Sequence, residues 1–177
     1  MKLNWRIPIV CKAILDNFDI KSIIDLGCAR GDYIKGFLEA GIDAWGIEGS
    51  SACIRELLCP EHRVQIGDLR APFNFDRKYD LAMCFEVVEH VEEEFADIMC
   101  ENFSKVSDKV LITAARPGQG GHYHMNCQPK EYWEHKMFRL GYNSNRKKAT
   151  EIAESFTRKE RKEIAGYCNN LIYFEKK

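Results

Sequence analysis

The chain has 177 residues, of which 45% are hydrophobic and 30% are charged, and its mean hydropathy is −0.39. This composition predicts a single globular domain over residues 1–177, and no apolar run approaches the ~18 residues of a membrane span. Because 26 Lys and Arg residues nearly balance 27 Asp and Glu residues, no overall charge draws the chain onto nucleic acid or an anionic membrane.

Apolar residues at helical spacing predict an N-terminal helix over residues 1–19. Further along, apolar runs predict strands at Ser22–Leu26, Ile42–Ile47, Arg63–Ile66, Tyr79–Phe85 and Lys109–Ala114, with helices between them at 32–40, 50–58 and 88–106. A loop over 115–128, a helix over 129–140, a short strand opening at 141, a helical stretch over 146–165 and a last strand at Leu171–Phe174 complete the pattern. This alternation predicts an α/β fold with a parallel sheet covered by helices on both faces.

Eight cysteines are spread along the chain, and no two have the CxxC spacing of a zinc knuckle or a thioredoxin-like motif. Several of them lie inside apolar runs, such as Cys84 within Leu81–Phe85. We therefore expect buried, reduced thiols and a cytoplasmic protein.

A glycine-containing turn, Asp25-Leu26-Gly27-Cys28-Ala29-Arg30-Gly31, joins the first expected strand to the next helix. In an open α/β sheet this is a place where ligands bind. A dinucleotide fingerprint would need glycine where Asp32 stands, and the GK[ST] of a P-loop is missing. The turn therefore favours a ligand that presents no phosphate to it.

Acidic residues end the next two expected strands. Glu48 lies 17 residues after Gly31, where a carboxylate can accept the two hydroxyls of a ribose. Asp68 follows the third strand and is placed to bind an adenine amino group, although a turn or cap role explains an aspartate there equally well.

Together, the glycine turn, Glu48, Asp68 and the stretch Tyr79–Glu86 resemble the motifs of the class I S-adenosylmethionine-dependent methyltransferases over about residues 20–145. Ala29 departs from the glycine that many members carry. The resemblance implies a Rossmann-like, seven-stranded, mostly parallel sheet in the order 3-2-1-4-5-7-6, with an antiparallel last strand. The helical insertion expected over 146–168, before that strand, is unusual for the family. It also implies S-adenosylmethionine as cofactor, bound by Asp25, Gly27, Cys28, Ala29, Gly31, Glu48, Gly49, Ser50, Gly67, Asp68, Leu69, Phe85 and Glu86.

An acid–histidine pattern follows the fourth expected strand. If a helix begins there, Glu86, Glu89 and His90 share one face at i, i+3 and i+4 and could hold a divalent ion or act as acid and base. The stretch resembles the ExxEH motif of small-RNA 2′-O-methyltransferases, which binds magnesium with a later histidine, and a stretch of ubiquinone-pathway O-methyltransferases. A loop histidine, His122 or His124, would supply the fourth ligand. We favour the account without an ion, in which Glu86 contacts the cofactor while Glu89 and His90 cap the helix.

The loop after the fifth strand carries two further histidines. Its sequence is similar to a loop of uncharacterised small-molecule methyltransferases, where the position of His124 lies over the acceptor pocket. His124, His122, Glu89 and His90 are therefore the catalytic candidates, although a loop histidine can equally serve only to bind backbone. Tyr123, Tyr132 and Trp133 could line the same pocket or belong to the core.

The charge distribution favours a small acceptor. Residues 86–101 hold seven acidic residues and no Lys or Arg, which would repel a phosphate backbone unless a cation intervenes. Residues 143–177 carry nine Lys or Arg against five acidic residues, which we interpret as a solvated helix face rather than an RNA-binding surface. We therefore predict O-methylation of a small-molecule or sugar-like acceptor, with no membrane partner. The alternatives are a metal-assisted RNA ribose 2′-O-methyltransferase and a non-catalytic cofactor-binding module.

Overall fold

The computed structural model describes residues 5–177. Helix α1 spans Arg6–Asn17 and buries the apolar face that its spacing predicted, including Val10, Ala13 and Ile14. The part of the predicted N-terminal helix that falls on residues 1–4 lies outside the described residues.

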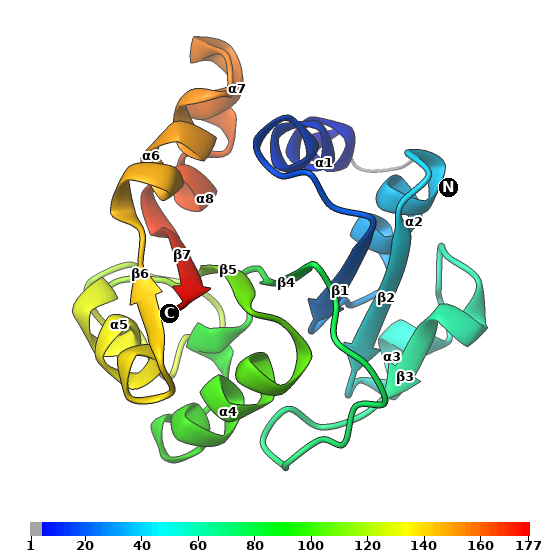
Figure 1. Ribbon diagram of the computed structural model, residues 1–177, viewed down its shortest axis with the longest axis horizontal. Helices are drawn as coiled ribbons and strands as arrows, with labels where there is room; N and C mark the ends of the chain where they lie inside the picture. Colours follow the sequence, from blue (N-terminus) through cyan, green and yellow to red (C-terminus); the bar gives the residue numbers. More distant parts are fainter. Residues whose placement is uncertain (1–4) are drawn as a thin grey trace.

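A seven-stranded sheet forms the centre of the molecule, in the order β3-β2-β1-β4-β5-β7-β6 (Figure 1). In this order the strands from β3 to β5 are parallel to one another, whereas β7 runs antiparallel to its neighbours β5 and β6. This confirms the strand order that the resemblance implied. The strands are β1 Ser22–Leu26, β2 Asp43–Glu48, β3 Val64–Ile66, β4 Leu81–Cys84, β5 Lys109–Thr113, β6 Tyr142–Ser144 and β7 Leu171–Lys176.

Helices cover both faces of the sheet (Figure 1). One face carries α1, α2 (Asp32–Glu39), α6 (Arg146–Glu154) and α8 (Ala165–Asn170), and the other carries α4 (Ala96–Val106) and α5 (Lys130–Arg139). The sheet separates two apolar cores, because the strand residues alternate between the two faces. Trp133 and Phe103 are wholly buried in the second core, so Trp133 is a core residue and not part of an acceptor pocket.

Three predicted helices are shorter than their apolar spacing suggested. The helix expected over 50–58 is only α3, Ser51–Ile54. The helical stretch expected over 146–165 divides into α6 and α7 (Arg158–Glu163), because Thr157 forms a capping box with Glu160 and starts a new helix; α8 then begins at Ala165.

The prediction of one helix over 88–106 is also wrong. Two short 3₁₀ turns, Val88–His90 and Glu93–Phe95, precede α4. Glu92 between them has extended backbone (ψ 143°), and Glu86 has a positive φ of 56°, which an α-helix does not contain. The acidic residues of this region therefore lie on several elements and not on one helical face.

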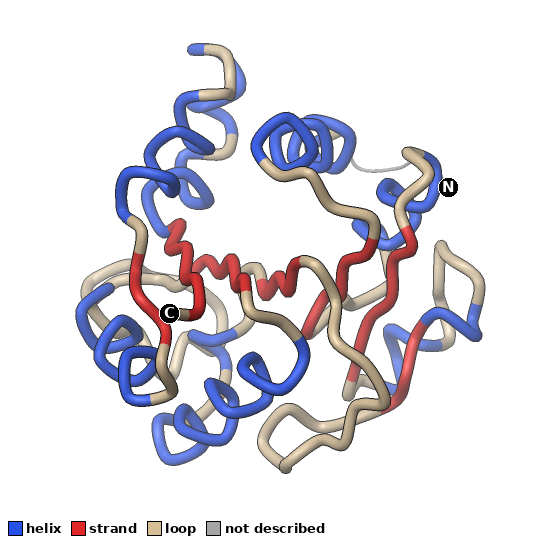
Figure 2. The backbone as a smooth tube through the Cα atoms, in the orientation of Figure 1, coloured by secondary structure: helices blue, strands red, loops and turns tan. Residues whose placement is uncertain are grey.

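The segment between β3 and β4 has no regular secondary structure apart from turns (Figure 2). The buried side chain of Asn102, on α4, holds it in place. Its Nδ2 donates to the carbonyls of Leu69 (3.2 Å) and Ala71 (2.9 Å), and its Oδ1 accepts from the N–H of Phe73 at 2.9 Å. These bonds fix the loop that closes one side of the site.

All eight cysteines are unpaired, and five of them are buried: Cys11, Cys28, Cys59, Cys84 and Cys100. This agrees with the expected thiols. Within residues 5–177, no helix has both the length and the apolar character needed to cross a lipid bilayer.

Candidate active site

A cleft of about 440 Å³ opens where the first strands of the sheet end at their carboxyl edge. Nine of the expected cofactor residues line it: Gly27, Ala29, Glu48, Gly49, Gly67, Asp68, Leu69, Phe85 and Glu86. The other four expected residues, Asp25, Cys28, Gly31 and Ser50, do not line it. Residues that the sequence did not indicate complete the wall: Ile47, Arg70, Val87, Val91, Glu92 and Met125.

The glycine turn keeps its shape for steric reasons. Gly31 has φ +75°, and a Cβ there would lie 2.4 Å from the Sγ of Cys59. Gly27 has φ +85°, and a Cβ there would lie 2.6 Å from a methyl carbon of Val87. Gly31 therefore allows the turn to pack closely against Cys59, outside the cleft, whereas Gly27 lines the cleft with its backbone.

Glu48 is anchored by two backbone N–H groups. One carboxylate oxygen accepts the N–H of Ala29 and the other accepts the N–H of Ser50, each at 2.7 Å. Each oxygen keeps a further acceptor position, so the carboxylate can still accept hydrogen bonds from a ligand. Ser50 thus contributes to the site through its backbone, although it does not line the cleft.

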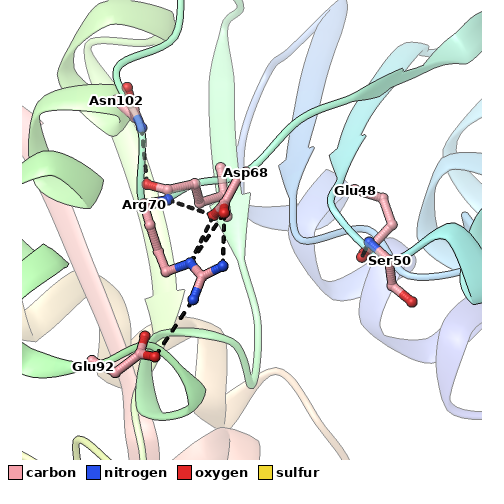
Figure 3. A network of polar contacts seen from close by, with 7 residues as sticks. Glu48, Ser50, Asp68, Arg70, Glu92 and Asn102 are labelled. Atoms are coloured by element: carbon pink, nitrogen blue, oxygen red, sulfur yellow. Dashed lines mark hydrogen bonds and ion pairs between the residues drawn. The ribbon is translucent and has the colours of Figure 1, made fainter.

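Asp68 lies across the cleft from Glu48 and is held by Arg70 (Figure 3). The Arg70 guanidinium donates to both carboxylate oxygens, at 2.8–3.1 Å, and its remaining nitrogen reaches Glu92 at 3.4 Å. The hydrogen bonds from Arg70 lower the pKa of Asp68, so its carboxylate is an acceptor. Arg70 is a residue that sequence reasoning missed, because its role depends on two neighbours, one of them 22 positions away.

Asp25 lies beneath the cleft rather than in its wall. Its side chain is buried, and its Oδ2 has no hydrogen-bond partner among the described residues. Burial, and then the neighbouring charge of Glu48, raise the pKa of Asp25 to about 8. Asp25 and the buried Cys28 therefore support the turn from inside the protein.

A cluster of three titratable side chains, Glu89, His90 and His124, borders the cleft. One ligand-type atom from each lies within 4.8 Å of the others, and His90 also lines the cleft. Glu89 is fully buried, and neither of its carboxylate oxygens has a hydrogen-bond partner in the described chain. Burial, with the nearby charge of Glu86, raises the pKa of Glu89 to about 7.

The loop over 115–128 folds back onto Glu89, which brings His124 next to Glu89 and His90. The N–H groups of Met125 and Asn126 donate to the carbonyl of Glu89 at 2.8 and 3.0 Å. Within the cluster the rings of His90 and His124 meet edge to face, with centroids 4.9 Å apart.

Backbone carbonyls orient both imidazoles. Nδ1 of His90 lies 3.2 Å from the carbonyl of Tyr123, and Nδ1 of His124 lies 3.3 Å from that of Gln119. A carbonyl accepts hydrogen bonds, so in the neutral rings Nδ1 carries the proton and Nε2 keeps its lone pair.

Two expectations about this cluster are corrected. Glu86 does not share a helical face with Glu89 and His90; its N–H binds Thr113 Oγ1 at 2.7 Å, and its side chain lies at the cofactor cleft. Glu89 does not cap a helix, because it lies within the 3₁₀ turn Val88–His90 and not at a helix N-terminus. His122 is exposed beside Tyr123 and lies outside the cluster.

A Rossmann-like sheet with a reversed last strand, and a cleft walled by a glycine turn and strand-end acids, define a class I S-adenosylmethionine-dependent methyltransferase. The family model described as "Methyltransferase domain" matches residues 7–157, and the chain belongs to that family. It is therefore an enzyme of this class, and its cofactor is S-adenosylmethionine.

Solved structures share this fold at low sequence identity. A TehB-like methyltransferase from Corynebacterium glutamicum is 17% identical, with a TM-score of 0.68 and coverage of 95% of this chain and 87% of its own. Magnesium protoporphyrin IX methyltransferase from Synechocystis, solved with SAH, is 16% identical, with a TM-score of 0.63 and coverage of 79% of this chain and 73% of its own. The methyltransferase domain of a bacterial CtHen1 is 20% identical, with a TM-score of 0.62 and coverage of 81% of this chain and 89% of its own. A search of the curated proteins found no match.

Proposed function

We propose that this enzyme methylates a hydroxyl oxygen of a small-molecule or sugar-like acceptor. The observation that carries the proposal is the cluster of Glu89, His90 and His124 at the edge of the cofactor cleft. Methylation of a hydroxyl is assisted by a group that removes its proton, and a buried carboxylate with two imidazoles supplies such groups. Because His90 belongs to both cluster and cleft, an acceptor over the cluster is next to the methyl donor.

The cleft fits S-adenosylmethionine in its polar groups. In this proposal the anchored carboxylate of Glu48 accepts the ribose hydroxyls, and Asp68 with the backbone of Leu69 faces the adenine. The unpartnered, buried Oε1 of Glu86 is available to the cationic amino-acid end of the cofactor. When bound, the cofactor supplies an electrophilic methyl group on a sulfonium.

His124 is the proposed base. Because its Nδ1 faces the carbonyl of Gln119, the lone pair of Nε2 is the one that can accept the acceptor's hydroxyl proton. With a pKa of about 7, Glu89 is partly ionised at neutral pH, and its ionised form stabilises the imidazolium that results, since a carboxylate favours a nearby cation. Met125 at the cleft wall helps to exclude water. The remaining contribution is positioning, which the loop provides by its two bonds to the carbonyl of Glu89.

A second candidate function, metal-assisted ribose 2′-O-methylation of RNA, is favoured by the same donor set. Glu89 with two free oxygens and two imidazoles with free Nε2 atoms fit a divalent transition metal better than magnesium, which prefers oxygen ligands. A bound ion would supply Lewis acidity toward an acceptor hydroxyl. The acidic residues near the cleft, Glu92 to Glu94, weigh against a phosphate backbone.

The test is transfer of a labelled methyl group to a cell extract divided into RNA, protein and small-molecule fractions. We expect label in the small-molecule fraction, lost in His124→Ala and kept in the exposed-histidine control His135→Ala. Label confined to RNA contradicts the first proposal and supports the second.

Chelation separates the two uses of the cluster. The assay is repeated after exhaustive treatment with a chelator and after readdition of magnesium, manganese or cobalt. Full activity in chelator eliminates the metal-assisted mechanism, whereas loss and rescue would support it.

A further inference from the structure

A second cavity, of about 430 Å³, lies beneath the helices that connect β6 to β7. Residues of α5, β6, α6, α8 and β7 line it together with Arg116 of the loop over 115–128, and it shares no lining residue with the cofactor cleft. In Figure 1, α6 and α8 stand over the end of the sheet where β7 begins. Its volume is in the range of small-molecule sites.

The walls of this cavity carry an excess of positive charge. Arg116, Lys130 and Arg146 line it, and Glu134 is the acidic residue among them. Arg146 binds Glu134 at 2.6 Å and the adjacent Glu131 at 2.7 Å, so its charge is shared between these two carboxylates. Three cations against two carboxylates leave one positive charge in excess.

Lys130 is held at the inner side of the cavity. Its Nζ donates to the carbonyl of Leu171 at 2.7 Å, and its side chain is half-buried. Burial lowers the pKa of Lys130, and the charges of Arg116 and Arg146 lower it further. The carboxylates of Glu134 and Glu131 act in the opposite direction, so burial is the main cause of the lowered pKa, and an anion at this place would favour the charged form of Lys130.

Arg116 is the cation available for a ligand. Within residues 5–177, no carboxylate forms an ion pair with its guanidinium, in contrast to the doubly paired Arg146. A guanidinium binds carboxylate or phosphate oxygens through two parallel hydrogen bonds, and the ammonium of Lys130 adds a second charge to the lining of the same cavity.

We propose that this cavity binds the carboxylate or phosphate group of a small molecule through Arg116 and Lys130. The proposal stands on the cavity and its charges and does not depend on the identity of the methyl acceptor. It also assigns a role to residues 146–170, whose helices cover the cavity and add Arg146, Thr150 and Cys168 to its lining.

The cavity is connected to the catalytic loop through Arg116. The N–H of Arg116 donates to Oε1 of Gln119 at 3.3 Å, and the N–H of Gln119 donates back to the carbonyl of Arg116 at 2.9 Å. The carbonyl of Gln119 in turn faces Nδ1 of His124. An anion on Arg116 therefore binds at the base of the loop that positions His124.

The binding test uses the full chain, labelled with ¹⁵N and titrated with inorganic phosphate, against sodium chloride at equal ionic strength. We expect saturable shifts at the amides of Thr150, Leu171 and Ile172, and affinity weaker by about tenfold or more in Arg116→Gln, since a charged hydrogen bond is lost. The matched control is Arg158→Gln, which removes an equal charge on α7 outside the cavity.

Unsaturable shifts, or equal affinity in Arg116→Gln and Arg158→Gln, would overturn the proposal. Arg116→Lys distinguishes charge from geometry, because it keeps the charge but loses the paired hydrogen bonds. The labelled-methyl assay then identifies the source of the anion. If inorganic phosphate inhibits methyl transfer in competition with the small-molecule fraction, the occupant of the cavity is the acceptor's own acidic group. If it does not compete, the occupant is a separate anion. The phosphate titration does not measure methyl transfer, so a failure of the proposed function leaves the binding result unchanged. The two proposals therefore fail separately.

Discussion

Replacing Asp25 by Asn tests whether the carboxyl group beneath the glycine turn is protonated in the folded protein. The pKa of Asp25 rises from its ordinary value of 3.8 to about 8, chiefly because the side chain is buried and also because of the neighbouring charge of Glu48. In the unfolded chain the same group ionises at its ordinary value. The folded state therefore binds a proton that the unfolded state has released.

The direction and size of the effect follow from linkage. The two pKa values differ by about 4, and each unit corresponds to ~1.4 kcal/mol. The stabilisation is complete below pH 3.8 and is lost as the pH rises through about 8, so ionised Asp25 costs up to about 6 kcal/mol of unfolding free energy at high pH. Asparagine has a similar shape and cannot ionise, so the variant lacks this loss.

The assay is urea unfolding of the wild type and of Asp25→Asn at pH 5, 7 and 9. Relative to the variant, the wild type should lose ~1.4 kcal/mol per pH unit up to about pH 8. Asp76→Asn, which changes an exposed carboxylate, serves as the control and should follow the wild type. Parallel curves for the wild type and Asp25→Asn would refute the reasoning, because the carboxyl would then ionise equally in both states.

The remaining predictions concern the cofactor, the base and the turn. Glu48→Ala should weaken S-adenosylmethionine binding by about tenfold or more, since a charged ribose contact is lost, and unchanged affinity by calorimetry would remove this residue from the site. His124→Ala should lower kcat by ~10²–10⁴-fold with little change in cofactor affinity; turnover within about threefold of wild type, as expected for His135→Ala, would make the residue structural. Gly31→Ala should destabilise the protein by ~2 kcal/mol or more, because it adds a Cβ at positive φ against Cys59, and an unchanged Tm would contradict this.

Local patterns were sufficient to predict most of the cofactor cleft. Strands β1 and β4 are short apolar runs buried on both faces, and their ends are marked by the glycine turn and by Phe85-Glu86. In a parallel sheet the carboxyl ends of the strands meet at one edge. Residues such as Glu48 and Asp68, although far apart in the chain, could therefore be assigned to one site from the sequence alone.

The break after β4 could not be predicted in this way. The spacing of Val88, Val91 and Phe95 is helical, but the backbone reverses at Glu86 and turns again before Ala96. The hydrogen bond from the Glu86 N–H to Thr113 on the neighbouring strand stabilises the non-helical conformation, and this contact lies 27 positions away. Tertiary contacts of this kind override local helical spacing.

What the sequence by itself determined is the class of enzyme, because a strand–turn–helix motif and strand-end acids depend on residues close together in the chain or at one sheet edge. What only the tertiary structure decided is how the separate segments meet. His124 lies beside Glu89 because backbone N–H groups of a folded loop bind the Glu89 carbonyl, and Arg116 and Lys130 line one cavity together with residues of α6 and α8. Both depend on hydrogen bonds and burial between distant segments, which have no periodic signal in the sequence.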